Sequence, residues 1–125
     1  MIQPKRDHYS IELRDGIAIV EIEERRILDE GIIQEMGAIL FELTERQGVR
    51  AVLLDWSKVT FVSSAFFGKL ITFDKKMKAT RRKHVFTAVC TEIYESFLLT
   101  HLYRMFEFKE TKEEGLEFLR QPQLT

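Results

Sequence analysis

Residues 59–70, VTFVSSAFFGKL, decide how the middle of this chain folds. The run from Val59 to Val62 is β-branched and aromatic, which is typical of a strand, and the apolar residues after it recur at helical spacing. Two adjacent serines, Ser63 and Ser64, stand at the junction, where a hydroxyl can accept an N–H of the first helical turn. The stretch therefore predicts a strand that passes directly into a helix.

The apolar pattern predicts strands alternating with helices along the chain. Asp15 and Gly16 give a strong hairpin signal, Asp29 is suited to cap a helix, and the run VRAVLL is apolar enough for a strand buried on both faces. Thr111 and Glu114 form a T-x-x-E capping box. The expected elements are strands at 8–13 and 17–22, a charged loop at 23–28, a helix from 29 to near 48, strands at 49–54 and 59–62, a second helix, a strand at 84–90, a helix from 91 to about 105, a short strand at 106–108 and a helix at 111–119.

The composition bounds the size and class of the protein. With 125 residues, of which 45% are hydrophobic, the chain has enough apolar material for one core. We therefore expect a single α/β domain over residues 1–125. Nineteen basic and twenty acidic side chains leave a net charge of -1, which argues against binding to nucleic acid. The basic run at residues 75–83 could still attract an acidic partner, RNA or anionic lipid, although charge on a helix face is usually solvated.

Cysteine content and hydropathy bear on the cellular compartment. Cys90 is the single cysteine, so it cannot form an internal disulfide, and its apolar neighbours predict a buried, reduced thiol. The amino-terminal sequence MIQPKRDHYS lacks the apolar core of a signal peptide, and no stretch is long enough to span a bilayer. These features favour the cytoplasm.

Patterns that would indicate catalysis or metal binding are weak. His8, His84 and His101 lack the paired spacing of a zinc site and are expected to be ordinary surface or strand residues. The serine pair does not complete a G-x-S-x-G motif, and the chain has no glycine-rich phosphate loop with its lysine. We therefore expect no metal, no cofactor and no enzymatic activity.

Two longer stretches resemble a known family. Residues 51–89, AVLLDWSKVTFVSSAFFGKLITFDKKMKATRRKHVFTAV, and residues 91–108, TEIYESFLLTHLYRMFEF, are similar to the STAS domain of bacterial anti-sigma factor antagonists. The resemblance rests on a buried strand that ends in Asp55, on the serine-rich helix start, and on a helix followed by a short strand. It implies a mixed β-sheet of about five strands with helices packed against it.

The family's hallmark at this helix start reads Asp-Ser-Ser/Thr-Gly-Leu-Gly, and the serine after the Asp is phosphorylated by a partner kinase that doubles as an anti-sigma factor. On this chain the six positions are occupied by Ser63, Ser64, Ala65, Phe66, Phe67 and Gly68. The acceptor hydroxyl and the last glycine are present, whereas the Asp, the second hydroxyl and the first glycine are absent. The resemblance therefore implies Ser64, or its neighbour Ser63, as the candidate for phosphorylation.

The resemblance and the helical spacing together suggest a docking surface. Small and polar residues of the second helix should face away from the sheet, where a partner backbone can come close. The predicted partner-binding residues are Arg26, Leu28, Asp29, Ser63, Ser64, Ala65, Phe66, Gly68, Lys69 and Thr72. Two alternatives stay open: Phe66 is either an exposed anchor or part of the core, and one of the two serines is simply the N-cap of the helix.

These features lead to two functional hypotheses. The first is a non-enzymatic regulatory domain that binds an anti-sigma factor with serine kinase activity, or a related regulatory protein, through the helix start. In this hypothesis, phosphorylation of Ser64 switches the binding. The alternative is a STAS-like ligand-binding or signalling-scaffold module that has lost this switch. An enzyme with a serine nucleophile ranks third. No nucleic-acid partner is expected, and a homodimer stays open.

Overall fold

The computed structural model describes residues 8–122. The ends of the predicted domain, residues 1–7 and 123–125, and with them most of the amino-terminal sequence MIQPKRDHYS, lie outside the described residues. The elements are β1 (Tyr9–Arg14), β2 (Ile17–Ile22), β3 (Arg26–Ile27), α1 (Glu30–Leu43), β4 (Ala51–Asp55), β5 (Phe61–Val62), α2 (Ser64–Ala79), β6 (Lys83–Thr87), α3 (Thr91–Leu99), the 3-10 helix η1 (Leu102–Met105), β7 (Phe108–Lys109) and α4 (Lys112–Arg120).

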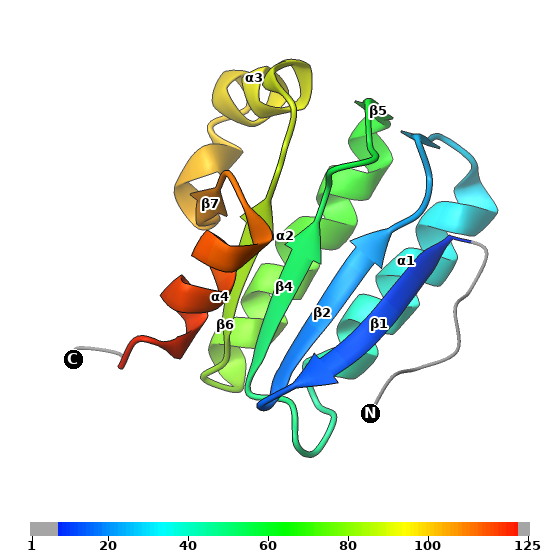
Figure 1. The fold of residues 1–125 in the computed structure, drawn as a ribbon. Coiled ribbons are helices and arrows are strands. Elements are labelled where there is room, and N and C mark those ends of the chain that lie inside the picture. The colour runs from blue at the N-terminus through cyan, green and yellow to red at the C-terminus, as the bar shows by residue number, and fades with distance from the viewer. Residues whose placement is uncertain (1–7, 123–125) are drawn as a thin grey trace.

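The main sheet has five strands in the order β1-β2-β4-β6-β7. β1 and β2 form an antiparallel hairpin, whereas β2, β4, β6 and β7 run parallel to one another. The hairpin turns at Asp15 and Gly16, which both have positive φ, as the Asp-Gly step predicts. In Figure 1, α1 and α2 lie behind the sheet and α4 lies in front of it. The predicted fold class, a mixed α/β sheet with helices packed against it, is confirmed.

A second, two-stranded sheet joins β3 to β5 in parallel. Figure 1 shows β5 above the carboxyl end of β4, so this small sheet lies at the carboxyl edge of the main sheet. The sequence predicts only a charged loop where β3 lies. Two residues are too few to show an alternating pattern, and their pairing depends on a segment more than thirty residues further along the chain.

Two hydrophobic clusters cover the two faces of the main sheet. The larger lies between the sheet and the helices α1, α2 and α3, and it contains the fully buried rings of Trp56, Phe86 and Phe97. The smaller lies under α4 and joins Leu116 and Leu119 to residues of β2, β4 and β6. Because β4 contributes side chains to both clusters, all five of its residues are buried, as the apolar run VRAVLL predicts.

α4 packs closely on the sheet because a glycine lies at the contact. A Cβ atom built on Gly115 would lie 2.6 Å from Cγ2 of Thr87 and 2.9 Å from Cδ1 of Leu53. Both distances are well below the optimal separation of two carbon atoms. The predicted capping box begins this helix, with Oγ1 of Thr111 accepting the N–H of Glu114 at 3.1 Å. The helix therefore starts at a fixed point and meets the sheet without a side chain at its fourth residue.

The structure divides one predicted helix into two. α3 ends at Leu99, His101 follows with a φ of 62°, and η1 is a short 3-10 helix. A residue in the left-handed region ends an α-helix. The turn brings Phe106 into the aromatic cluster, where its ring stacks on that of Phe86 with the centroids 4.7 Å apart. The prediction of one helix from 91 to about 105 is therefore wrong, and the packing of Phe106 gives the physical reason.

Other predicted boundaries shift by a few residues. α1 ends at Leu43 instead of near Gly48, and β7 lies two residues later than its predicted start. β6 ends at Thr87 because Ala88 adopts a φ of 58°. Cys90 consequently lies in the connection to α3 and is only half-buried. The prediction of a buried thiol is wrong for this reason.

Candidate functional site

Ser63 and Ser64 differ in their roles at the start of α2. Ser63 has an extended backbone, and its Oγ accepts the N–H of Ala65 at 3.2 Å, so Ser63 is the N-cap. Ser64 is the first residue of the helix and is exposed. Its hydroxyl makes no hydrogen bond to any residue in the range 8–122. The capping interpretation therefore holds for Ser63, and the hydroxyl of Ser64 is available to a partner.

Main-chain hydrogen bonds fix this helix start against the segment that precedes α1. β3 pairs with β5, and the N–H of Ser63 donates to the carbonyl oxygen of Ile27 at 2.9 Å. Asp29 follows two residues later and caps α1, with its Oδ1 accepting the N–H of Ile32 at 3.1 Å. The starts of α1 and α2 are consequently held side by side.

A shallow hollow of about 420 Å³ lies between these two helix starts. Its lining residues are Leu28, Glu30, Ile33, Gln34, Ser63, Ala65 and Lys69. Leu28, Ser63, Ala65 and Lys69 are among the predicted partner-binding residues, so the structure brings together members of that set from two distant segments. Leu28 is 46% exposed and supplies an apolar edge to the hollow.

The α1 side of the hollow was not predicted from the sequence. Nζ of Lys69 donates to Oε1 of Gln34 at 3.1 Å, which joins α2 to α1. The stem of Lys69 also packs on Gly37, where an added Cβ atom would lie 2.8 Å from Cδ of the lysine. Helical spacing places Glu30 and Gln34 on one face of α1. Only the tertiary contact shows that this face borders α2.

The other predicted residues lie outside the hollow. Arg26 is exposed, with its guanidinium carbon 4.8 Å from the ring centroid of Phe61, which is itself 43% exposed and was not predicted. Gly68 and Thr72 are exposed further along α2, where Oγ1 of Thr72 donates to the carbonyl oxygen of Gly68 at 3.3 Å. Asp29 is exposed at its capping position. These four predicted residues are therefore exposed but do not line the hollow.

Phe66 belongs to the core and not to this surface. Its side chain is fully buried, and its ring centroid lies 6.0 Å from that of Trp56. Phe66 precedes Leu70 and Phe73 by four and seven residues, which is the spacing of a helix face turned toward the core. A ring without exposed area cannot anchor a partner. The core alternative therefore holds, and the prediction of Phe66 as a partner-binding residue is wrong.

A buried carboxylate in contact with a histidine lies near the other end of α2. Oδ1 of Asp74 is 2.8 Å from Nε2 of His84, and its Oδ2 is 3.0 Å from Nζ of Lys78. The side chains of Asp74 and His84 are 1% and 8% exposed. Burial lowers the pKa of His84, and the hydrogen bond to Asp74 opposes that effect. Within residues 8–122, no group of three His, Cys, Asp or Glu side chains is arranged to hold a metal ion.

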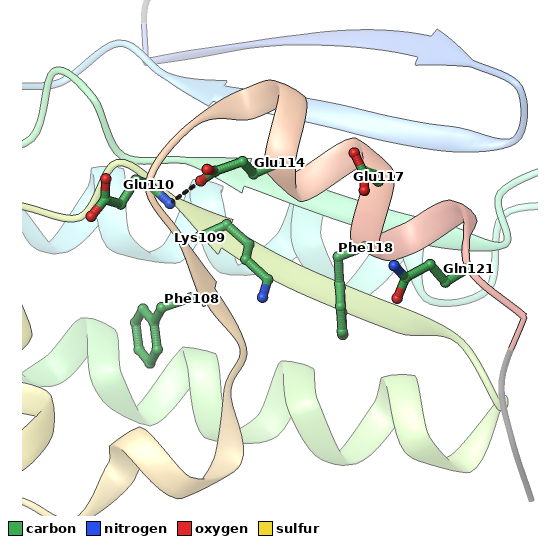
Figure 2. A pocket seen from close by; sticks show the side chains of 7 residues that line it. All are labelled: Phe108, Lys109, Glu110, Glu114, Glu117, Phe118 and Gln121. Atoms are coloured by element: carbon green, nitrogen blue, oxygen red, sulfur yellow. Dashed lines mark hydrogen bonds between the residues drawn. The ribbon is translucent and has the colours of Figure 1, made fainter.

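A larger hollow, of about 620 Å³, lies between β7 and α4 (Figure 2). Its walls include Lys109, Glu114 and Phe118. The carboxylate of Glu114 accepts the N–H of Glu110 at 3.1 Å, the bond dashed in Figure 2, and also the N–H of Thr111. Nζ of Lys109 lies 5.4 Å from the ring centroid of Phe118. Glu114, one of the acids that line this hollow, is therefore occupied in capping α4.

The fold and the site define a small α/β domain in which an exposed serine begins a helix beside a shallow hollow. Among known families, the STAS domain matches residues 8–115. The chain therefore belongs to the STAS domain family, as the sequence resemblance indicates. None of the helices in the described part of the chain has the length and apolar character needed to cross a membrane.

Solved structures of anti-sigma factor antagonists share this fold. An anti-sigma factor antagonist (STAS) domain protein from Planctomyces limnophilus is 18% identical, with a TM-score of 0.78 over 91% of this chain and 99% of that chain. SpoIIAA in its unphosphorylated form is 12% identical, with a TM-score of 0.71 over 91% of this chain and 99% of that chain. Bacillus SpoIIAA in its phosphorylated form is 13% identical, with a TM-score of 0.69 over 90% and 99%. No curated protein sequence matches the chain. At these identities the likeness establishes the fold.

Proposed function

We propose that this protein is a non-enzymatic regulatory domain that binds an anti-sigma factor with serine kinase activity, or a related regulatory protein, at the start of α2. Phosphorylation of Ser64 is proposed to weaken that binding. The observation that carries the proposal is the exposed hydroxyl of Ser64 at the first position of α2, beside a serine that already caps the helix. The fold shared with anti-sigma factor antagonists supports it. Such a role belongs in the cytoplasm.

The start of α2 can accept a phosphate without refolding. First-turn N–H groups and the positive end of the helix dipole stabilise an anion there. α2 has no acidic residue in its first turn, so the helix itself places no like charge beside Ser64. A phosphate adds about -1.5 to -2 charges at neutral pH. The modification therefore changes the surface and leaves the fold intact.

The surface next to Ser64 suits a protein partner. Ala65 and Gly68 are exposed and small, and no atom lies within 4 Å of a Cβ built on Gly68. A partner main chain can therefore come close to α2. Leu28 offers an apolar contact on the other side of the hollow. A charge placed on Ser64 would have to be desolvated or repelled when such a partner docks, which is the physical basis of the switch.

The test is the affinity of the full chain for an anti-sigma kinase from the same cell, measured by calorimetry. Ser64→Ala should keep the affinity of the wild type, and Ser64→Asp should lower it about tenfold, which corresponds to about 1.4 kcal/mol. Gln47→Glu is the matched control, since Gln47 is exposed in the loop after α1, at the end of that helix opposite to Asp29. This control adds one negative charge away from the proposed surface and should leave affinity unchanged.

Mass spectrometry after incubation with the kinase tests the switch separately. Phosphate on Ser64 supports it, whereas phosphate only on Ser63, or on neither serine, contradicts it. Ala65→Arg tests the surface itself, because the large side chain should block docking whatever the state of Ser64. If the kinase binds Ala65→Arg as tightly as the wild type, the docking surface lies elsewhere. A melting temperature that rises with a small ligand in place of the kinase would favour a ligand-binding module.

A further inference from the structure

Another hollow, of about 320 Å³, opens beside the second half of α2, the first residues of β6 and the residues around η1. Its lining residues are Asp74, Lys78, Arg82, Lys83, His84, Arg104, Met105, Phe106, Glu107 and Phe118. At a helical rise of about 1.5 Å per residue, Asp74 and Lys78 lie about 15–21 Å along α2 from Ser64. The hollow is therefore separate from the proposed docking surface.

Both carboxylates that line this hollow are already paired. Asp74 contacts Nζ of Lys78 at 3.0 Å and Nε2 of His84 at 2.8 Å. Glu107 contacts Nζ of Lys109, which lies outside the hollow, at 3.4 Å. Neither acid is left to neutralise the remaining cations of the lining.

Among residues 8–122, three cationic side chains of the lining make hydrogen bonds to neutral oxygens. Arg82 donates to the carbonyl oxygen of Val49 at 2.6 Å, and Lys83 donates to a carbonyl oxygen at the end of α4 at 3.0 Å. Nε of Arg104 donates to the hydroxyl of Tyr103 at 3.3 Å. Within residues 8–122, none of the three forms an ion pair with an Asp or Glu side chain. An anion is the chemical species that such a group of cations lacks.

His84 adds a second, independent observation. Asp74 holds its Nε2, and its ring centroid lies 5.2 Å from that of Phe73 and 5.5 Å from that of Phe106. The other ring nitrogen, Nδ1, is buried and has no hydrogen-bond partner among the described residues. Buried polar atoms without partners are uncommon in native proteins and call for a reason. A negative charge in the hollow would favour a proton on this nitrogen.

We propose that this hollow binds a small oxyanion of the phosphate class, either inorganic phosphate or a compact phosphate monoester. Arg82, Lys83 and Arg104 provide the charge, and a guanidinium group suits the paired oxygens of a phosphate. Met105, Phe106 and Phe118 of the lining can supply apolar contacts to the body of a monoester. His84 takes up a proton from solvent on Nδ1 as the anion binds, while Nε2 keeps its proton and its bond to Asp74.

The primary experiment is an NMR titration of the full chain with sulfate, which does not itself titrate between pH 5 and 8. Sodium chloride keeps the ionic strength constant, so that general screening is matched. Sulfate should shift the ring resonances of His84 saturably and should raise the pKa of His84 relative to the chloride sample. The charged residues that line the hollow with His84 are the cations Lys78, Arg82, Lys83 and Arg104 and the acids Asp74 and Glu107. All six are present in both samples, so the difference reports the anion.

Arg104→Gln is the test variant, because Arg104 is exposed and, among the described residues, its side chain hydrogen-bonds to the hydroxyl of Tyr103. The substitution should weaken sulfate binding about tenfold through the loss of a charge-assisted hydrogen bond. Lys75→Gln is the matched control: it removes one positive charge from an exposed residue of α2 that does not line the hollow. Ser64→Asp should leave sulfate binding unchanged, which keeps this proposal distinct from the proposed partner switch.

Titrations with inorganic phosphate and with phenyl phosphate at pH 7 distinguish the two sources of the anion. Tighter binding of phenyl phosphate assigns the site to a monoester, and equal or weaker binding assigns it to free phosphate. Resonances of His84 that follow ionic strength alone would overturn the proposal. Equal losses of sulfate affinity in Arg104→Gln and Lys75→Gln would also overturn it, because they would show nonspecific attraction of the anion to the basic surface.

Discussion

Replacing Gly115 by alanine tests how closely α4 packs on the sheet. The added methyl group would lie 2.6 Å from Cγ2 of Thr87, 2.9 Å from Cδ1 of Leu53 and 3.3 Å from Cγ1 of Val85. All three neighbours lie on strands of the main sheet, and overpacking of this kind typically costs about 1–3 kcal/mol. Alanine also improves helix propensity by about 1 kcal/mol. We therefore expect Gly115→Ala to lower the free energy of unfolding by as much as about 2 kcal/mol.

Gly68→Ala separates the two contributions. Gly68 lies within α2, is exposed, and has no atom within 4 Å of an added Cβ atom. This variant therefore gains the helix propensity alone and should stabilise the protein by about 0.5–1 kcal/mol. The difference between Gly115→Ala and Gly68→Ala isolates the steric cost under α4, which we expect to be about 1–3 kcal/mol.

Urea denaturation, followed by circular dichroism, measures both free energies, and the slope of each transition shows whether the unfolded state has changed. A loss of 1 kcal/mol corresponds to roughly 3–6 °C in melting temperature for a domain of this size. If Gly115→Ala stabilises the protein as much as Gly68→Ala does, α4 moves away from the sheet without cost. That result would refute the inference that this glycine is required by the close contact.

Further substitutions test the core, a helix cap and the buried histidine. Phe66→Ala should lower the free energy of unfolding, measured by urea denaturation, by about 3–5 kcal/mol, because the ring of Phe66 is fully buried. A decrease of under about 1 kcal/mol would contradict that burial. Thr111→Ala should cost about 1 kcal/mol in the same assay through loss of the capping box, and an unchanged stability would show that α4 does not depend on it. Burial lowers the pKa of His84 in the folded protein, whereas in the unfolded chain histidine has its ordinary pKa of about 6.5. Just below that pH the unfolded chain therefore binds more protons than the folded protein, so the free energy of unfolding should fall as the pH drops from 7 toward 5. His84→Gln should make the free energy of unfolding, measured by urea titration at each pH, depend less steeply on pH. The same dependence in the wild type and the variant would contradict the assignment of this effect to His84.

Much of the fold follows from local sequence signals. The Asp15-Gly16 turn, the capping box at Thr111 and the buried run of β4 all appear where the pattern predicts them. Each signal acts within a few residues, through backbone conformation, a nearby hydrogen bond or side-chain periodicity. The cap at Ser63 belongs to the same group, because its acceptor and donor are two residues apart.

The site could be predicted only in part. Helical spacing correctly leaves Ala65, Gly68 and Thr72 on an exposed face of α2. The same spacing allows two orientations for Phe66, and the contact with Trp56 decides between them. The hollow beside Ser63 also needs α1, which reaches it through the pairing of β3 with β5.

By itself, the sequence determined the alternation of the main strands and helices, the mixed α/β class and the serine at the start of α2, because these depend on short-range conformational preferences. The tertiary structure alone decided that Phe66 is buried, that the chain turns at His101, and that Arg82 and Arg104 line one hollow with His84. Burial, pairing and the gathering of charges depend on contacts between segments far apart in the chain. The periodicity within one segment carries no information about which other segment will cover it.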